Sequence, residues 1–328
     1  MQTVLIGLQH GDEGKGKISK ILGETNNYDC YVRFNGGPNA GHTIYHGDKK
    51  IVLHQLPCGI INYKNVLIST DCVVDIVKLI KEIKLLENIG FNDIRKYIHI
   101  SKFCHVITDD NVQQDKDNNI IGTTCSGIGP TYSNKMLRKG ARIREIIGYY
   151  KLVEPFEFLH QFNNIFFEGA QGFELDIDYG DYPYVTSSSC ISQSIFKNGG
   201  NMSIKCVVYG ICKMYDTYVG TKKFQDENDL DLKRLQIIGE EYGATTGRQR
   251  QCNWLNMEKL LYACKINNVK HIYMNKCDII EKIGVYKLYG VGERLFTFGN
   301  YDDMIGYIET TLQRYNYNIT FSGSKNNL

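Results

Sequence analysis

The chain has 328 residues, of which 42% are hydrophobic and 23% are charged, so disordered and fibrous proteins are excluded. The 38 Lys and Arg residues nearly balance the 36 Asp and Glu residues, and the formal charge of +2 argues against a dedicated nucleic-acid-binding protein. No apolar run approaches the ~20 residues of a membrane helix and no export signal is visible, so we expect a cytoplasmic protein. The eleven cysteines include no CxxC pair, and we expect reduced thiols that bind no metal.

Short apolar runs of strand length alternate with helical patterns along the chain. Val4–Ile6 predicts a first strand, and the glycine-rich turn after it leads into a helix that begins near Gly16. The same patterns recur as strands at Asn65–Ser69, Ile165–Phe167, Lys205–Tyr209 and His271–Met274, and as helices at Ile76–Leu86 and Met257–Ile266. The polar, acidic stretch Asp109–Asn119 is expected to be a surface loop. Because strands alternate with helices, we predict an α/β fold with a mainly parallel central sheet, helices on both faces and a single domain over residues 1–328.

The turn after the first strand has the composition of a phosphate-binding loop. It reads GDEGKGK over Gly11–Lys17, although Ile18 stands where a P-loop has Ser or Thr. Backbone N–H groups in such a turn and at a helix N-terminus bind anions. Asp12 is unusual inside this loop because a carboxylate repels phosphate. It fits only if it binds Mg²⁺ or removes a proton during a reaction.

A second motif indicates which nucleotide binds. The sequence NKCD over Asn275–Asp278 directly follows a predicted strand, and an N-K-x-D pattern in this position is typical of guanine recognition. The carboxylate of Asp278 would accept two N–H groups of the base edge, and the stem of Lys276 would pack on the ring. Four residues alone also fit a polar strand end. Together with the phosphate loop, they make GTP the leading ligand, bound at the carboxyl ends of parallel strands.

Further glycine-rich segments carry polar side chains suited to anionic substrates. In NGGPNAGHT over Asn35–Thr43, His42 is a candidate proton donor to a phosphate oxygen, and the Gly41 carbonyl a candidate Mg²⁺ ligand. Similar segments are Gly122–Pro130, Glu168–Gly172, Tyr182–Ser188 and Gly243–Arg250. The first of these is followed by Lys135, Arg138 and Arg142. Each of these fits a solvated loop when taken singly. Their combination beside a nucleotide site indicates at least a second anionic substrate.

Together these motifs closely resemble the adenylosuccinate synthetase family. The family signatures correspond to QHGDEGKGK over Gln9–Lys17 and GIGPTYSNKMLR over Gly127–Arg138. The resemblance continues through Glu168–Gly172, Tyr182–Ser188, Thr245–Trp254 and Asn275–Asp278, so that it spans nearly the whole chain. It implies a carbon–nitrogen ligase of purine nucleotide biosynthesis, which joins IMP and L-aspartate with GTP and Mg²⁺. The products would be adenylosuccinate, GDP and phosphate, formed through a 6-phosphoryl-IMP intermediate.

The resemblance also implies roles for individual residues. Asp12 would remove the N1 proton of IMP, His42 would donate to the charge that develops on the leaving side, and one Mg²⁺ per subunit would lie on Asp12 and the Gly41 carbonyl. Residues implied for IMP are Asp12, Lys15, Asn39, Thr124, Arg138, Gln171, Thr186 and Arg248. Residues implied for aspartate are Gly243, Thr245, Thr246 and Arg248. Residues implied for GTP are Gly11, Glu13, Gly14, Lys15, Gly16, Lys17, Gly41, Thr43, Arg250, Lys276 and Asp278. Arg138 would reach the site from a second subunit, so we expect a homodimer.

The chain departs from the family pattern in several places, which bear on substrate affinity more than on the pair Asp12 and His42. His10 stands where the family usually has Trp, and Tyr218 replaces a customary Arg. The other departures are an interrupted arginine-rich run at Gln249, Gln251 and Asn253, and shortened segments between Arg142 and Glu168 and after Asp278.

Two alternatives to IMP ligation stay open at this point. Some phage relatives accept (d)GMP and form a 2-aminoadenylosuccinate product, but in those the Asp of the first motif is a small residue, so Asp12 favours IMP. A GTP-binding regulatory protein without ligase activity belongs to another class. It would need Ser or Thr after Lys17 to hold Mg²⁺, and Ile18 is found there instead.

Overall fold

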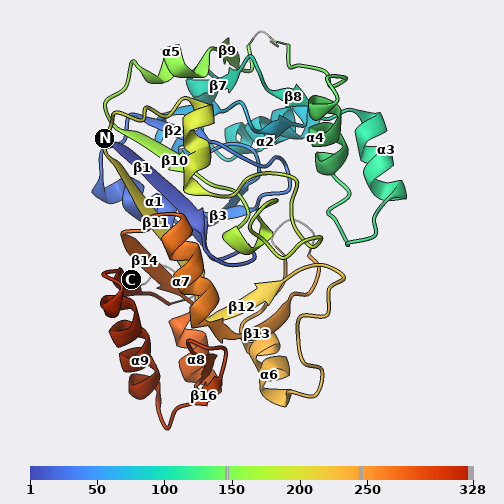
Figure 1. Ribbon diagram of the computed structural model, residues 1–328. Helices are drawn as coiled ribbons and strands as arrows, with labels where there is room; N and C mark the ends of the chain where they lie inside the picture. The colour runs from blue at the N-terminus through green and yellow to red at the C-terminus, as the bar shows by residue number, and fades with distance from the viewer. Residues whose placement is uncertain (145, 147, 244–246, 324–328) are drawn as a thin grey trace.

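The computed structural model describes residues 1–144, 146, 148–243 and 247–323, and its centre is a nine-stranded sheet in which every pair of neighbours is parallel (Figure 1). In spatial order its strands are β17 (Asn318–Phe321), β14 (His271–Asn275), β11 (Cys206–Lys213), β1 (Gln2–Gly7), β10 (Ile165–Glu168), β2 (Cys30–Arg33), β5 (Asn65–Ile68), β7 (Ile98–Ser101) and β9 (Lys151–Val153). The predicted α/β fold with a mainly parallel sheet is therefore confirmed.

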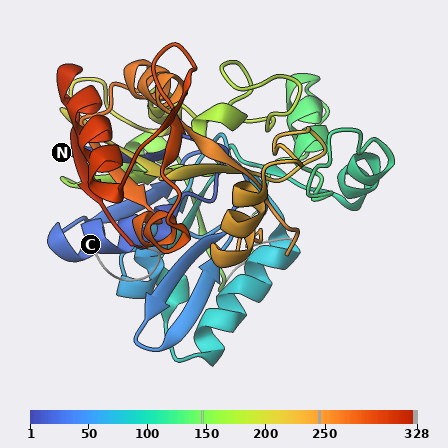
Figure 2. The ribbon, with the colours of Figure 1, turned by 90° about the horizontal axis from the view of Figure 1, so that it is seen from below.

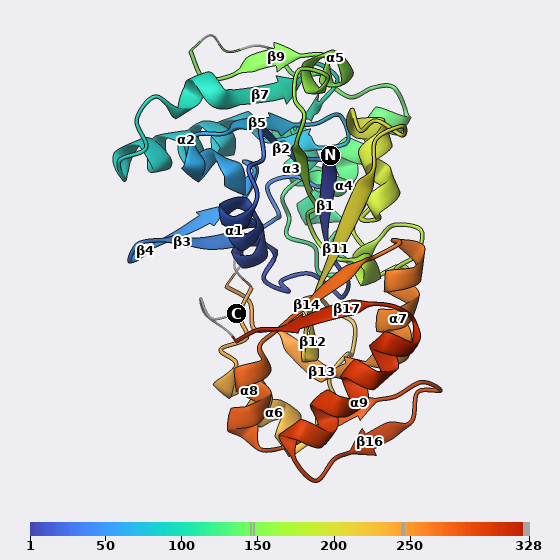
Figure 3. The same ribbon diagram turned by 90° about the vertical axis from the view of Figure 1, so that its left-hand side faces the viewer.

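Helices cover both faces of this sheet. Alternate residues of β1 face opposite ways, since Val4 and Ile6 belong to one hydrophobic core and Leu5 to another. The helices α1 (Lys15–Thr25) and α2 (Ile76–Asn88) contribute to the core around Leu5, and α7 (Met257–Ile266) and α9 (Tyr301–Arg314) to the other (Figure 3). The remaining α-helices are α3 (Asp109–Asp117), α4 (Ile128–Met136), α5 (Pro155–Leu159), α6 (Leu230–Ile238) and α8 (Cys277–Ile283). Short 3-10 helices span Cys58–Asn62, Ile94–Tyr97, Phe173–Leu175 and Ser192–Asn198.

Smaller sheets accompany the central one. A four-stranded sheet has the order β12 (Tyr215–Tyr218), β13 (Gln251–Asn256), β15 (Lys287–Tyr289) and β16 (Leu295–Thr297). The hairpin of β3 (His42–His46) and β4 (Lys49–Leu53) extends away from the central sheet (Figures 2 and 3). Two short strands, β6 (Val73–Val74) and β8 (His105–Val106), form a parallel pair.

The segment Asp109–Asn119 corrects one prediction, because it forms helix α3 rather than a surface loop. Its N-terminus has a capping box in which the Thr108 hydroxyl accepts from the Asn111 N–H at 3.3 Å and the side-chain Oδ1 of Asn111 accepts from the Thr108 N–H at 3.1 Å. Asp115 is buried, and its carboxylate accepts hydrogen bonds from the loop that follows the helix. Capping and these tertiary contacts outweigh the polar composition.

The loops that follow the central strands form one end of the sheet. The phosphate loop follows β1, Asn35 follows β2, and the segment from Gly169 follows β10. Because these three strands are parallel neighbours, their carboxyl ends bring segments from distant parts of the chain together. None of the helices within the described ranges is long and apolar enough to cross a membrane.

Candidate active site

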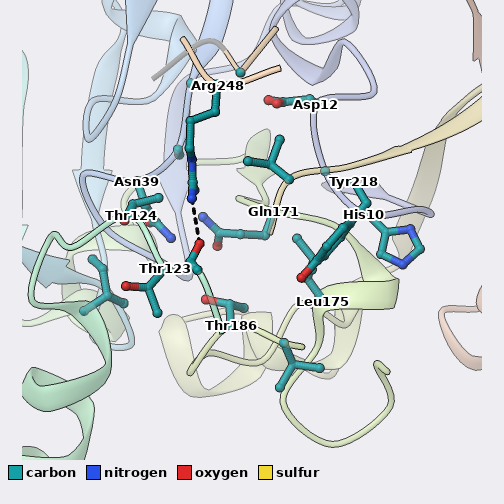
Figure 4. A pocket seen from close by; sticks show the side chains of 18 of the residues that line it. His10, Asp12, Asn39, Thr123, Thr124, Gln171, Leu175, Thr186, Tyr218 and Arg248 are labelled. Atoms are coloured by element: carbon teal, nitrogen blue, oxygen red, sulfur yellow. Dashed lines mark hydrogen bonds between the residues drawn. The ribbon is translucent and has the colours of Figure 1, made fainter. Parts of the chain in front are cut away.

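A cavity of about 310 Å³ lies where these loops meet (Figure 4). Polar groups on one wall come from the phosphate loop and β3, and those on the facing wall come from the segments around Thr124 and Thr186. The implied site residues that line it are Gly11, Asp12, Gly14, Lys15, Gly16, Asn39, Gly41, His42, Thr43, Thr124, Gln171, Thr186, Gly243, Arg248 and Arg250. Residues with implied roles at three substrates therefore face a single cavity.

The other implied residues lie elsewhere. Glu13 is buried beneath the phosphate loop, and Arg138 is exposed at the end of α4. Lys17, Lys276 and Asp278 are not among the cavity-lining residues. Thr245 and Thr246 lie outside the described residues, so their implied contact with aspartate stays a prediction.

The buried side chain of Glu13 fixes the conformation of the phosphate loop. One carboxylate oxygen of Glu13 accepts from the Gly11 N–H at 3.0 Å, and the other accepts from Lys15 Nζ at 2.6 Å. Lys15 Nζ also donates to the Gln171 carbonyl, and Asn275 at the end of β14 donates to the Glu13 carbonyl at 2.7 Å. The loop is thus bound to the ends of two other strands. A cation and backbone N–H groups are fixed at the N-terminus of α1, which is the arrangement that binds phosphate.

Asp12 projects from the loop in a left-handed backbone conformation, with φ of 57°. Its Oδ2 accepts from Arg250 Nε at 3.0 Å and lies 2.7 Å from Nη2 of the same guanidinium. The side chain of Asp12 is 29% exposed, whereas that of Arg250 is 10% exposed. The Arg250 guanidinium thus lies beside the Asp12 carboxylate, which by itself would repel a phosphate in this loop.

His42 stands at the start of β3 and is held by two buried charged residues. Its Nδ1 lies 2.6 Å from Oε1 of Glu168, and the same oxygen accepts from Arg33 at 2.6 Å. Although burial raises it, the Arg33 charge and the hydrogen bond from His42 hold the pKa of Glu168 well below its usual range. Burial, together with the Arg33 charge, lowers the pKa of His42 to about 4 despite Glu168. His42 is therefore neutral at pH 7, and its Nδ1–H donates to the Glu168 carboxylate.

The opposite nitrogen of His42 is oriented for a ligand. Nε2 is buried and has no hydrogen-bond partner within the described part of the chain, while His42 lines the cavity. The same holds for the Oε1 atom of Gln171, whose side chain Figure 4 shows in the middle of the cavity. Buried polar atoms are nearly always satisfied in proteins. Two such atoms at one cavity indicate that a polar ligand completes the site.

The segment Gly122–Gly129 forms the opposite wall. Arg248 donates to the Gly122 carbonyl at 2.8 Å, which is the hydrogen bond drawn in Figure 4. Asp115 of α3 accepts from the Thr123 hydroxyl and the Gly127 N–H, both at 2.8 Å. Asp115 therefore fixes the loop and the first turn of α4, whose N-terminus suits a second anion.

The predicted guanine-binding motif begins helix α8. Lys276 has a left-handed backbone with φ of 65°, and its Nζ donates to the Gly239 carbonyl at 2.9 Å. Lys17 binds the hydroxyl of Ser322 and the carbonyl of Gly323, and an added Cβ at Gly323 would lie 3.7 Å from Asp278. The end of the described chain therefore packs beside Asp278, next to the helix that begins at the phosphate loop.

Four buried charged residues at or beside the cavity were not predicted as site residues: Arg33, Asp115, Glu168 and Glu241. Glu168 and Arg33 end neighbouring strands, β10 and β2, and a charge at the carboxyl end of an apolar strand is the signal that could have found them. His42, Cys58 and Glu168 also form a buried group of possible metal ligands. The Arg33 guanidinium on Glu168 occupies the position of a cation, which disfavours a metal ion there.

Comparisons with known proteins give the family. The sequence profile described as adenylosuccinate synthetase matches residues 4–164 and 153–304. The adenylosuccinate synthetase of Buchnera aphidicola subsp. Baizongia pistaciae is 38% identical, over 86% of this chain and 79% of that protein. That of Thermoplasma volcanium is 34% identical, over 87% of this chain and 77% of that protein. This chain is thus shorter than these relatives.

Two solved structures are similar to this one. The structure of fully ligated adenylosuccinate synthetase from Plasmodium falciparum has a TM-score of 0.87 and 28% identity, and the match covers 99% of this chain and 97% of that one. The cyanophage S-2L succinoaminodeoxyadenylate synthetase bound to dGMP and dATP has a TM-score of 0.72 and 20% identity, over 94% and 98% of the two chains, which shows a shared fold alone. The profile match and the relatives above 30% identity show that the chain belongs to the adenylosuccinate synthetase family, a family of ligases.

Proposed function

We propose that this chain joins IMP and L-aspartate in a reaction driven by GTP, giving adenylosuccinate, GDP and phosphate. The observation that carries the proposal is that Asp12, His42 and Gln171 face one cavity beside a phosphate loop. A GTP switch needs phosphate contacts but no general base facing a second substrate. The carboxylate in the loop is therefore the feature that favours a ligase.

In the first step, the oxygen at position 6 of IMP attacks the γ-phosphorus of GTP. Asp12 takes the N1 proton of IMP, which makes this oxygen a nucleophile, and the bond between the γ-phosphorus and GDP breaks. The amide of Gln171 holds the same edge of the base. His42 Nε2 faces the phosphates, whose negative charge raises the pKa of the imidazole and so allows it to donate a proton to the leaving side. Lys15 and the loop N–H groups stabilise the charge on the transferred phosphoryl group.

In the second step, the amino group of aspartate attacks C6 of the phosphorylated base. The bond between C6 and its oxygen breaks, and phosphate leaves with that oxygen. Arg248 is placed to bind a carboxylate of aspartate, because it reaches across the cavity from the loop that begins at Gly243. Thr124 and Thr186 on the far wall are assigned to the IMP phosphate.

Mg²⁺ fits the oxygen ligands at this cavity, since a carboxylate and backbone carbonyls are its preferred protein ligands. We assign it to Asp12 and the Gly41 carbonyl, both at the cavity wall. When bound, the ion would neutralise charge on the phosphates. Arg250 would then release Asp12 and turn to a phosphate oxygen of GTP.

Product analysis tests this proposal directly. The chain is incubated with IMP, aspartate, GTP and Mg²⁺, and the nucleotides are separated and identified by mass spectrometry. We expect adenylosuccinate and GDP in equal amounts, and little product when ATP replaces GTP. Parallel reactions with GMP and dGMP address the alternative substrate, for which Asp12 is unfavourable. A 2-amino product made faster than adenylosuccinate would replace IMP as the substrate, and GTP hydrolysis independent of aspartate would support a regulatory protein.

A further inference from the structure

Glu241 is a fully buried carboxylate to which the proposed reaction gives no role. It follows α6, and its side chain has no exposed surface. One oxygen, Oε1, accepts from the Tyr215 hydroxyl and lies 3.7 Å from Lys276 Nζ. The other, Oε2, accepts from Arg250 Nη1 and lies 3.6 Å from Lys213 Nζ. Three cations from three separate strand ends therefore surround one carboxylate.

Glu241 carries its negative charge in this environment. Although burial raises it, the charges of Lys213, Arg250 and Lys276 lower the pKa of Glu241 to about 2. Burial lowers the pKa of Lys276, and the Glu241 charge opposes that decrease. Glu241 thus helps to keep the half-buried Lys276 protonated.

Arg250 connects Glu241 to the base of the proposed reaction. Its Nη1 binds Glu241, while Nε and Nη2 bind Asp12 along another edge of the planar guanidinium. A guanidinium can hold two carboxylates in this way because its donors form a rigid planar fork. Lys276 is bound to the Gly239 carbonyl, two residues before Glu241. The contacts of Glu241 therefore extend to the phosphate loop and to the N-K-x-D segment.

We propose that Glu241 is a positioning residue for the nucleotide site: it holds Arg250 and Lys276 in place to receive GTP and, before the nucleotide binds, keeps Arg250 against Asp12. This assignment rests on the proposed function, which places both cations at GTP. Glu241 contacts all three cations, and Arg250 also reaches Asp12 at the cavity wall. Glu241 therefore keeps these cations oriented beside the phosphate loop.

The test is the affinity for Mg²⁺-GTP, measured by calorimetry without IMP and aspartate so that no ligation occurs. Glu241→Gln keeps the size of the side chain and an acceptor for Tyr215, but it removes the charge. We expect at least about tenfold weaker GTP binding, because a charged hydrogen-bond partner of a buried cation is lost. GTP binding by Glu241→Gln should also weaken more steeply with rising pH than that of the wild type, since the Lys276 pKa falls further when the Glu241 charge is removed.

A double-mutant cycle separates positioning from a general structural effect. If Glu241 acts through Arg250, Glu241→Gln should weaken GTP binding by less than about threefold in a chain that already carries Arg250→Ala. Asp229→Ala is the matched control, because Asp229 caps the other end of α6 and contacts Trp254 rather than the cations. It should lower the unfolding temperature while GTP affinity stays within about twofold of the wild type, as independent sites do.

The outcomes distinguish this assignment from the proposed function. A wild-type chain that does not bind GTP overturns both. If the wild-type chain binds GTP, two results overturn the positioning role alone. One is that the effects of Glu241→Gln and Arg250→Ala on GTP affinity are additive, and the other is that Asp229→Ala loses as much GTP affinity as Glu241→Gln. Unchanged GTP affinity in folded Glu241→Gln does the same, and unfolding of that variant moves the test to Glu241→Asp, which keeps the charge and should bind GTP more tightly than Glu241→Ala.

Discussion

Asp12 is the residue on which the proposed function depends most. Its left-handed backbone conformation is one that Asn adopts readily, so Asp12→Asn keeps the loop while removing the base and the negative charge. We expect the rate of adenylosuccinate formation to fall by 10²–10⁴, the usual contribution of a general base. The unfolding temperature should change by no more than about 3 °C, because the lost ion pair with Arg250 is partly exposed. Steady-state rates and a thermal scan of the two proteins check both statements, and a variant with half of the wild-type rate would remove Asp12 from the mechanism.

His42 should make the folded state sensitive to acid. The pKa of its imidazole is about 4 in the folded chain and 6.5 in the unfolded chain. Between these two pH values the unfolded state therefore binds a proton that the native state does not. Stability is therefore complete above pH 6.5 and is lost as pH falls. Between pH 6.5 and 5 this one group should cost about 2 kcal/mol. Urea unfolding at both pH values should show that His42→Gln loses less stability than the wild type, and equal losses would contradict the assignment.

Several residues to which the resemblance assigns roles lie together in the structure, whereas the contacts that hold them are distant in sequence. The implied residues Asp12, His42, Gln171 and Arg248 do lie around one cavity. Glu168, which holds the imidazole, is 126 residues away from His42, and no local pattern pairs them. The motif Glu168–Gly172 was recognised, but the partner of its first residue depends on which strands become neighbours.

At the scale of elements, helix α3 and the loop Gly122–Gly129 act together. The acidic composition of α3 predicted a loop, since a pattern without apolar periodicity says nothing about a capping box or a carboxylate bound to another segment. Asp115 gives this helix its function, because it binds two groups of the loop that faces the cavity.

Substitution of Asp115 should therefore change substrate binding more than turnover. Asp115→Ala leaves the Thr123 hydroxyl and the Gly127 N–H without their acceptor, and the loop that we propose for the IMP phosphate becomes less well fixed. We expect the KM for IMP to rise by about tenfold, equivalent to the ~1.4 kcal/mol typical of a lost charged hydrogen bond. The KM for GTP should stay within a factor of two, since the phosphate loop is held by Glu13 instead. Parallel increases in both constants would show a general disturbance.

For the whole molecule, the alternation of strands and helices predicted the parallel sheet but not its strand order. The order depends on which apolar strands pair at long range, and it places β1 between β10 and β11, far along the chain. The sheet of β12, β13, β15 and β16 was not predicted, because two of its strands have three residues each and β16 is exposed. Single-domain organisation stays a prediction.

The surface around Arg138 bears on the expected homodimer. Arg138 is exposed at the end of α4 and is absent from the cavity lining of its own chain, and the neighbouring Met136 and Leu137 are 75% and 56% exposed. A second copy that covers these apolar side chains would bring Arg138 to the partner's cavity. Mixed dimers of Asp12→Asn and Arg138→Ala chains would then contain one intact site.

Complementation between these two inactive variants measures this arrangement. Random mixing of subunits should restore about a quarter of wild-type activity, because half of the dimers are mixed and each has one intact site of two. Two copies of the same variant should remain inactive when mixed. No recovery in mixed dimers, with dimerisation verified by ultracentrifugation, would place Arg138 in its own subunit's site or outside the reaction.

In the proposed mechanism, the oxygen at position 6 of IMP attacks GTP before aspartate displaces it. IMP labelled with ¹⁸O at this position distinguishes the two-step ligation from simple GTP hydrolysis, because the label follows the bond that breaks at C6. We expect the released phosphate to carry one ¹⁸O atom for each adenylosuccinate formed, as measured by mass spectrometry. Unlabelled phosphate released alongside adenylosuccinate, or phosphate released without it, would contradict the account.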